Sequence, residues 1–226
     1  MTSNPPDLPP GSWGWFHDLA RWIGRWLFIP FFRLHRHEVD RIPASGPVVL
    51  VANHSSLCDG PVLLGLVGRR MVFLVKRELF RGPMGWALPR IGQIAVRREQ
   101  VDRAPLLAAQ AVLRGGGMVG VFPEGTRGSG EAASARNGAA WLARSTGAVV
   151  VPVACRGTYR PSGARRRFRP RVDVLVGEPF PVSGERGRAG LAAATEQIRA
   201  ALSGLVIELD GLREGADPAC GRASRR

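Results

Sequence analysis

Short apolar runs rich in β-branched residues alternate along most of the chain with segments whose apolar residues recur at helical spacing. The runs predict strands at 47–53, 70–76, the end of 82–99, 118–125, 148–157 and 172–180. The other segments predict helices at 60–68, the start of 82–99, 102–117, 135–147 and 187–209. This alternation indicates an α/β fold, a single-domain layered sandwich with a mostly parallel or mixed sheet flanked by helices.

The segment WGWFHDLARWIGRWLFIPFFRL, residues 13–34, has an amphipathic helical pattern and precedes the first strand. One broad face of the helical wheel is apolar: Trp15, Phe16, Leu19, Trp22, Ile23, Trp26, Leu27 and Ile29. The opposite face is polar: His17, Asp18, Arg21 and Arg25. A helix that ends near Pro30 is about 22 Å long, which is too short for a hydrocarbon core of roughly 30 Å. The pattern predicts a helix lying in a membrane interface, and the alternative is a helix packed on its own domain.

Composition limits the classes of partner. The chain has 226 residues, which suits one domain, and a formal net charge of +14, which favours nucleic acid, anionic lipid surfaces or phosphorylated substrates. Lys76 is the only lysine, so arginine carries the excess, and a codon-usage bias would also produce this skew. Three cysteines without a C-x-x-C pair indicate a reducing compartment and no structural zinc.

His54, Cys58 and Asp59 follow the apolar run VVLVA, where a strand is expected to end. Functional groups of α/β folds gather at the carboxyl ends of strands. If His54 lies in the loop and Asp59 begins the next helix, the carboxylate can accept from one imidazole nitrogen and leave the other as a base. The spacing alone leaves three alternatives open: Asp59 as a helix N-cap, Cys58 as a nucleophile activated by His54, or a metal site, which the upstream position of the other histidines disfavours.

A second polar cluster lies in VFPEGTRGSG, residues 121–130, where another strand runs into a glycine-rich turn. Gly125 and Gly128 permit a tight backbone with N–H groups directed outward, which suits an anion. Arg127 adds a planar guanidinium that matches phosphate, and Glu124 could orient it or receive a hydroxyl group. The alternative is a turn with a solvated ion pair.

Both blocks together resemble the 1-acylglycerol-3-phosphate O-acyltransferases, a family of glycerophospholipid acyltransferases. NHSSLCD resembles the family's N-H-x-x-x-x-D block, and VFPEGTRG resembles its F-P-E-G-T-R-S block. Between them, IGQIAVRRE is similar to a G-x-I-F-I-x-R block, with Arg97 assigned to the family's arginine. VVVPVACRG resembles a later block with a V-P-V core. The four blocks occur in family order, and the resemblance covers about residues 35–180.

The resemblance implies transfer of an acyl group from acyl-CoA or acyl-carrier protein to the hydroxyl of a lysophospholipid, with 1-acylglycerol-3-phosphate converted to phosphatidic acid in phospholipid biosynthesis. It assigns His54 as general base and Asp59 as its partner. The residues that it assigns to the acceptor are Glu124, Gly125, Thr126 and Arg127, with Arg97 on the phosphate and Lys76 as a further basic residue. It implies no metal and no cofactor beyond the thioester donor. Gly128 in place of serine, and Cys58 and Gly60 beside Asp59, depart from the family pattern and leave the exact acceptor open.

The implied organisation is a loose Pro-rich tail at 1–12, a membrane-interface helix at 13–34, an acyltransferase domain at 35–210 and a disordered basic tail at 211–226. The implied partners are the lysophospholipid, the acyl thioester, a membrane surface and, as one form of the donor, acyl-carrier protein, with no nucleic acid. The implied location is the cytoplasmic face of the cell membrane, where the protein would be peripheral.

Other functions stay open on the sequence alone. A basic nucleic-acid-binding protein fits the net charge, although Phe168 is the only aromatic residue in the arginine-rich loop and no nucleic-acid motif is present. A hydrolase that uses Cys58 or His54 on thioesters fits the cluster after the first strand. A different lyso-lipid or polar acceptor is the alternative within the family.

Overall fold

The computed structural model describes residues 6–97, 103–123, 132–159, 168–182 and 187–216, with the backbone alone for 132–136 and 216. Within these residues seven strands form one sheet: β1 (Arg33–His37), β2 (Val48–Ala52), β3 (Met71–Lys76), β4 (Ile94–Val96), β5 (Met118–Val121), β6 (Val149–Arg156) and β7 (Arg171–Val176). The α-helices are α1 (Gly14–Ile23), α2 (Asp59–Leu66), α3 (Gly82–Arg90), α4 (Ala104–Arg114), α5 (Ala132–Thr146) and α6 (Gly187–Ala216).

The strands lie in the order β1-β7-β6-β2-β5-β3-β4, and every neighbouring pair is parallel except β6 and β7. The predicted α/β sandwich with a mostly parallel sheet is therefore confirmed. Because β2, β3, β4, β5 and β6 run in the same direction, the loops that follow them leave from one edge of the sheet.

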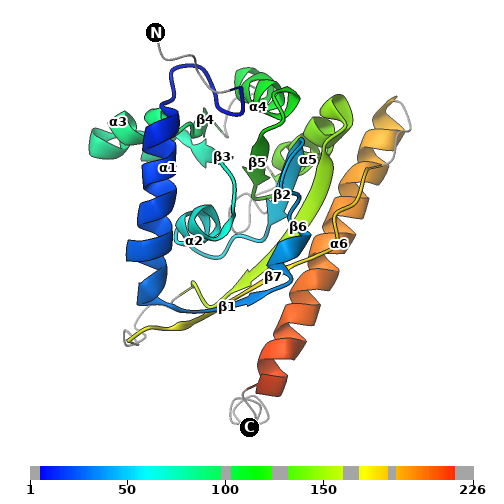
Figure 1. Cartoon of the computed structure of the whole chain (residues 1–226). Coiled ribbons are helices and arrows are strands. Elements are labelled where there is room, and N and C mark those ends of the chain that lie inside the picture. Colours follow the sequence, from blue (N-terminus) through cyan, green and yellow to red (C-terminus); the bar gives the residue numbers. More distant parts are fainter. Residues whose placement is uncertain (1–5, 98–102, 124–131, 160–167, 183–186, 217–226) are drawn as a thin grey trace.

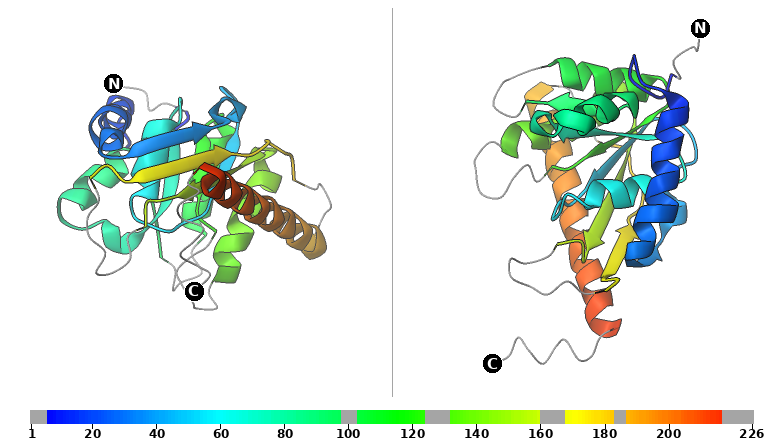
Figure 2. Two further views of the ribbon diagram at one scale, coloured as in Figure 1. Left: turned by 90° about the horizontal axis from the view of Figure 1, so that it is seen from below. Right: turned by 90° about the vertical axis from the view of Figure 1, so that its left-hand side faces the viewer.

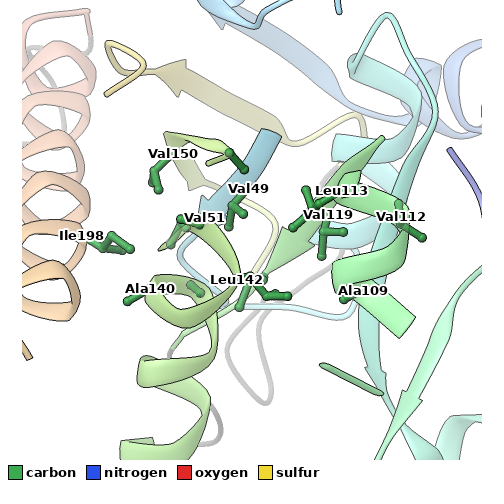
Figure 3. Packing of buried hydrophobic residues seen from close by; sticks show 14 of the residues in the cluster. Val49, Val51, Ala109, Val112, Leu113, Val119, Ala140, Leu142, Val150 and Ile198 are labelled. Atoms are coloured by element: carbon green, nitrogen blue, oxygen red, sulfur yellow. The ribbon is translucent and has the colours of Figure 1, made fainter. Parts of the chain in front are cut away.

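Helices cover both faces of the sheet, with α2 on one side and α6 on the other (Figure 1). Side chains of a strand alternate between the faces, so Val49 and Val51 pack with α4, α5 and α6, whereas Val48 and Leu50 pack against α2. The hydrophobic cluster that contains Val49 and Val51 is shown in Figure 3, where Leu142 and Ile198 project from α5 and α6 toward the strands. Burial on both faces explains why the strands read as continuous apolar runs.

The N-terminal helical segment consists of α1, a π-helical turn at Gly24–Phe28 and a 3-10 turn at Ile29–Phe31. It lies along the outside of α2, away from the sheet (Figure 1; Figure 2). His17 on its polar side is fully buried: the Met71 amide donates to Nε2 over 3.3 Å, and Nδ1 donates to the Ile91 carbonyl over 2.6 Å. Burial lowers the pKa of His17, so this imidazole is a neutral structural side chain at pH 7.

Two further residues of the polar side, Asp18 and Arg21, also contact the domain. Arg21 donates to the Val67 carbonyl over 3.0 Å, and Asp18 accepts from Nε and Nη2 of Arg70 over 3.0 and 2.7 Å. The apolar side is the exposed one: Trp15, Leu19, Trp22, Ile23, Trp26, Leu27 and Phe31. The segment therefore packs with the orientation opposite to that of an ordinary surface helix, in which the apolar stripe faces the core.

Two glycines allow the close contact between the N-terminal helical segment and α2. Gly24 of the π-helical turn and Gly65 of α2 meet so closely that a Cβ on Gly65 would lie 2.7 Å from the carbonyl carbon of Gly24 and 2.8 Å from the Arg25 nitrogen. Such distances are shorter than van der Waals contact, so a side chain at Gly65 would separate the two helices.

The chain ends and the first strand differ from the sequence-based expectations. The tail expected at 1–12 is packed from residue 6 onward, because Leu8 is 3% exposed and belongs to the core. The tail expected at 211–226 is helical as far as Ala216, and Arg213 donates to Asp173 over 2.8 Å. Residues 217–226 lie outside the described part. Strand β1 was not predicted because its sequence, RLHRH, is polar and lies at a sheet edge.

We expect Gly65→Ala to lower the free energy of unfolding by about 1–3 kcal/mol, because the added Cβ overpacks the contact with Gly24. Urea denaturation measures the change. Gly204→Ala is the matched control, since a Cβ at this position in α6 meets nothing within 4 Å and helical Ala is favoured over Gly by up to about 1 kcal/mol. Equal midpoints for Gly65→Ala and the wild type would contradict the close packing.

Candidate functional site

His54 and Asp59 lie close together at the carboxyl end of β2, as the sequence predicted. His54 is in the loop after the strand, Asp59 is the first residue of α2, and His54 Nδ1 is 3.1 Å from Asp59 Oδ2. The His54 side chain is 28% exposed, whereas that of Asp59 is fully buried. The pair therefore joins an accessible imidazole to a carboxylate that solvent does not reach.

Asp59 does not act as a helix N-cap, because its carboxylate points back into the loop. The backbone N–H groups of Ser55 and Ser56 each donate to Oδ2 over 2.8 Å, whereas an N-cap accepts from the following helical residues. Burial would raise the pKa of Asp59. Hydrogen bonds from His54, Thr158, Ser56 and Ser55 outweigh it and lower this pKa below the ordinary value.

An ionised carboxylate only accepts hydrogen bonds, so the proton in the contact with Asp59 belongs to Nδ1 of His54. Nε2 then keeps its lone pair and is free to accept a proton from a substrate. This arrangement is that of an oriented general base.

Three residues at this site were not predicted from the sequence. The Thr158 hydroxyl donates to Asp59 Oδ1, and the Cys155 thiol is 3.9 Å from the same oxygen. Asn53 joins the end of β2 to β6: its Nδ2 donates to the Cys155 carbonyl over 2.9 Å, and its Oδ1 accepts from the Cys155 amide over 2.7 Å. Burial raises the pKa of Cys155 to about 12, so this thiol is a structural donor and no nucleophile at neutral pH.

The imidazole also rests on an aromatic stack. The rings of His54 and Phe122 are 4.4 Å apart between centroids, and Phe122 stacks on Phe73 at 5.3 Å with an interplanar angle of 4°. Gly120 makes room for the Phe73 ring, since a Cβ there would lie 2.4 Å from it. Rings from β3 and from the end of β5 thus limit the positions that His54 can adopt.

The alternative in which Cys58 is a nucleophile has no support in the geometry. Cys58 is the N-cap residue of α2, and its amide donates to the Ser56 hydroxyl over 3.2 Å. The nitrogen of His54 that faces the helix is already bonded to Asp59. No described hydrogen bond links His54 to the Cys58 thiol.

The other predicted residues are placed only in part. Lys76 ends β3, pairs in register with Val96 of β4 and has its Nζ 3.8 Å from Glu78, and Arg97 follows Val96 at the same edge of the sheet. Counted from Gly92, however, the final arginine of the family block is Arg98 rather than Arg97. Arg98 and the predicted acceptor loop, Glu124, Gly125, Thr126 and Arg127, lie outside the described residues.

Across the described ranges, no group of three or more His, Cys, Asp or Glu side chains is arranged to hold a metal ion. The chemistry that the described groups offer is proton abstraction by an imidazole whose tautomer is fixed. The loop that the sequence predicts to bind an anion follows β5 in the chain, and β5 is hydrogen-bonded to β2.

The structure is thus an α/β sandwich with an accessible histidine and a buried aspartate paired at the carboxyl end of its central strand β2. A model of the Acyltransferase family matches residues 33–156, more than half of the chain. The chain therefore belongs to the Acyltransferase family.

Individual relatives are also named as acyltransferases. The chloroplastic 1-acyl-sn-glycerol-3-phosphate acyltransferase LPAT1 of Arabidopsis thaliana is 34% identical over 73% of this chain and 48% of its own length. The 1-acyl-sn-glycerol-3-phosphate acyltransferase of Pseudomonas aeruginosa is 31% identical over 86% of this chain and 76% of its own. The crystal structure of PlsC, the 1-acyl-sn-glycerophosphate acyltransferase of Thermotoga maritima, has a TM-score of 0.60 and 28% identity, covering 86% of this chain and 78% of that one. The chain spans about half the length of the two chloroplastic relatives it matches, 48% and 51%.

Thr158→Val should raise the pKa of Asp59 above its wild-type value and lower the free energy of unfolding by about 1.5–3 kcal/mol, because a buried charged acceptor loses a donor. Carbon NMR of the carboxylate gives the pKa, and urea denaturation gives the stability. Thr158→Ser keeps the hydroxyl and should restore both values. If the valine and serine variants titrated alike, Thr158 would have no role in keeping Asp59 ionised.

Proposed function

We propose that this protein transfers an acyl group from an acyl thioester to the free hydroxyl of 1-acylglycerol-3-phosphate, forming phosphatidic acid. The observation that carries the proposal is the His54–Asp59 pair, whose buried carboxylate leaves Nε2 of the imidazole as a base. Membership of the Acyltransferase family and the names of the relatives support the reaction class and the acceptor.

In this reaction His54 Nε2 takes the proton of the acceptor hydroxyl as its oxygen attacks the thioester carbonyl. A hydroxyl group has a pKa far above neutrality, so a positioned base accelerates its attack by roughly 10²- to 10⁴-fold. The carbonyl of a thioester is already activated, so no protein nucleophile is needed. The protonated imidazole is stabilised by Asp59 and passes its proton to the leaving thiolate, which restores the starting state.

The acceptor's phosphate is assigned to the loop at Glu124, Gly125, Thr126 and Arg127, with the arginines after β4 and Lys76 as further cations. A guanidinium pairs with phosphate through two parallel hydrogen bonds, which fixes the orientation of the glycerol as well as its affinity. No metal and no cofactor is part of the proposal, and the donor is acyl-CoA or acyl-carrier protein.

The substrates are membrane lipids, and we assign membrane contact to the exposed apolar side of the N-terminal helical segment. Trp15 is 64%, Trp22 53% and Trp26 59% exposed, while the polar side of the same segment packs on the domain. Aromatic residues of this kind are favoured at the membrane interface. The described part of the chain holds no helix of the length and hydropathy that a bilayer crossing needs. The location that we propose, a peripheral one at the cytoplasmic face of the membrane, rests on the exposed apolar side of this segment.

A second group of aromatic residues extends this surface from α1 to α3. The rings of Trp13 and Trp86 are 6.0 Å apart, those of Phe16 and Trp86 are 5.5 Å apart, and Arg90 lies over both tryptophans at 5.0 and 4.5 Å. Trp86 and Met84 of α3 are about half exposed. The proposed membrane face thus includes residues of both the N-terminal helical segment and α3, and these ring contacts hold the two together.

We expect His54→Ala to lower the turnover of acyl transfer to 1-acylglycerol-3-phosphate by roughly 10²- to 10⁴-fold, because the general base is lost. The formation of phosphatidic acid is followed with both acyl-CoA and acyl-carrier protein as donors, over a panel of lyso-lipid acceptors.

Cys58→Ala and His35→Gln are the controls for this experiment, since neither touches His54, and both should keep nearly wild-type turnover. Near wild-type turnover of His54→Ala would overturn the mechanism. Release of thiol without acyl-lipid product would point to a thioester hydrolase. Salt-sensitive DNA binding without lipid binding would point to a nucleic-acid-binding protein.

Arg127→Ala should raise the KM for 1-acylglycerol-3-phosphate about tenfold or more with little change in kcat, because a charged hydrogen bond to the phosphate is lost. Monoacylglycerol, which lacks the phosphate, is the matched acceptor: its weak turnover should be the same with the variant and the wild type. An unchanged KM for the phosphorylated acceptor would remove Arg127 from the phosphate site.

A further inference from the structure

A groove lies between the N-terminal helical segment and α2, apart from the His54 site. It has a volume of about 180 Å³ and is lined by Asp18, Arg21, Trp22, Arg25, Trp26 and Gly65. Since a water molecule occupies roughly 30 Å³ of liquid, the groove has room for a group the size of a phosphate with some of its waters. Its lining combines cations with flat aromatic rings.

The charges around the groove leave an excess of positive charge. Asp18 accepts two hydrogen bonds from Arg70, and Arg21 lies 3.6 Å from the same carboxylate. Arg25 is exposed, its guanidinium lies 5.7 Å from the centre of the Trp26 ring, and within the described ranges it forms no ion pair. Nε of Arg21 is buried and has no hydrogen-bond partner among the described atoms. Two arginines of one groove thus have donors without a partner among the described residues.

The groove follows from the local backbone. Arg25 belongs to the π-helical turn, a rare element that interrupts the regular helix and is frequent at functional sites. The turn lies against Gly65 of α2, and the missing side chains of Gly24 and Gly65 bring the two backbones together beneath the arginines. The sequence carried no sign of the π turn, since the segment reads as a continuous amphipathic helix.

The groove lies at the border of the exposed apolar side. Trp22 and Trp26 line it and also belong to that side, at 53% and 59% exposure. An interfacial helix buries its apolar face at the boundary between acyl chains and headgroups. The tryptophans would then enter this boundary, and the arginines beside them would lie at the depth of the lipid phosphates, where long cationic side chains are favoured.

We propose that this groove binds the phosphate of an anionic phospholipid in the bilayer, held by the Arg25 guanidinium between Trp22 and Trp26. The site rests on the proposed membrane association but is separate from the acceptor-phosphate site after β5. It holds a lipid that is not a substrate and thereby orients the whole protein at the membrane surface, because the N-terminal helical segment is anchored to the domain.

The test compares sedimentation of the full chain with vesicles of phosphatidylcholine alone and of phosphatidylcholine with phosphatidylglycerol. Arg25→Gln removes the charge, and Arg25→Lys keeps the charge but loses the guanidinium fork. Arg25→Gln should bind the phosphatidylglycerol vesicles about fivefold more weakly than the wild type, the loss typical of one basic residue at a membrane surface. Arg25→Lys should also bind them more weakly than the wild type, because an ammonium group cannot form the two parallel hydrogen bonds of a guanidinium with the phosphate. All proteins should bind the phosphatidylcholine vesicles within about twofold of each other, because the apolar side is intact.

Arg36→Gln is the control for net charge, since Arg36 is an exposed arginine of β1 away from the groove. It should bind both vesicles within about twofold of the wild type. If Arg25→Lys bound like the wild type, or if Arg36→Gln lost as much as Arg25→Gln, only net charge would matter and the site would be refuted. Competition by inorganic phosphate beyond that of chloride at equal ionic strength would identify free phosphate as the ligand and overturn the lipid assignment.

Turnover of the wild type on a short-chain 1-acylglycerol-3-phosphate below its micelle concentration reports the proposed function separately. If this turnover is absent, the proposed function is refuted, while the vesicle comparison still tests lipid binding at the groove. If turnover is present and the Arg25 variants bind vesicles normally, the groove proposal alone fails.

Discussion

The ionised carboxylate of Asp59 is buried, and the geometry of the site depends on how its charge is satisfied. Among the residues that the structure describes, no arginine or lysine forms an ion pair with it: the donors are two backbone N–H groups, the Thr158 hydroxyl, the Cys155 thiol and His54. A buried charge without such partners would cost several kcal/mol or take up a proton. The loop after β2 must therefore curl over the start of α2, and this curl brings the imidazole to the carboxylate. The hydrogen bonds that satisfy the buried carboxylate in the folded protein are thus also the ones that orient the imidazole.

The parallel pairing of β2 and β6 supplies the donors from the far part of the chain. Asn53 extends this pairing beyond the last strand residues through its two hydrogen bonds to Cys155. Thr158 follows directly and reaches the second carboxylate oxygen. Both faces of the central strands are buried, so the register cannot slip without exposing core residues. The core thereby fixes the register that brings Thr158 and Cys155 to Asp59.

The sequence predicted those parts of the structure that local patterns encode. The strands and helices follow from alternation and periodicity, and the His54–Asp59 contact follows from a loop of fixed length. Thr158 and Cys155, the distant partners of Asp59, escaped prediction because about one hundred residues separate them from it, and only the strand order brings them together. The burial of Leu8 was not predicted, because a single apolar residue in a Pro-rich segment gives no helical or strand periodicity.

The N-terminal helical segment shows a further limit of sequence patterns. A helical wheel identifies two faces but not which one packs. Both nitrogens of buried His17 have partners in distant segments, the Met71 amide and the Ile91 carbonyl. These hydrogen bonds turn the polar side inward and leave the tryptophans outside. The exposed apolar side is therefore a consequence of specific polar contacts and of the Gly24–Gly65 approach.

The central claim is that Asp59 holds His54 as a base with its proton on Nδ1. Nitrogen-15 NMR of the imidazoles measures this directly, and the chain contains only four histidines. We predict that the neutral His54 ring carries its proton on Nδ1 and has an unprotonated Nε2, and that Asp59→Asn abolishes this preference. A neutral His54 with its proton on Nε2 in the wild type would contradict the account.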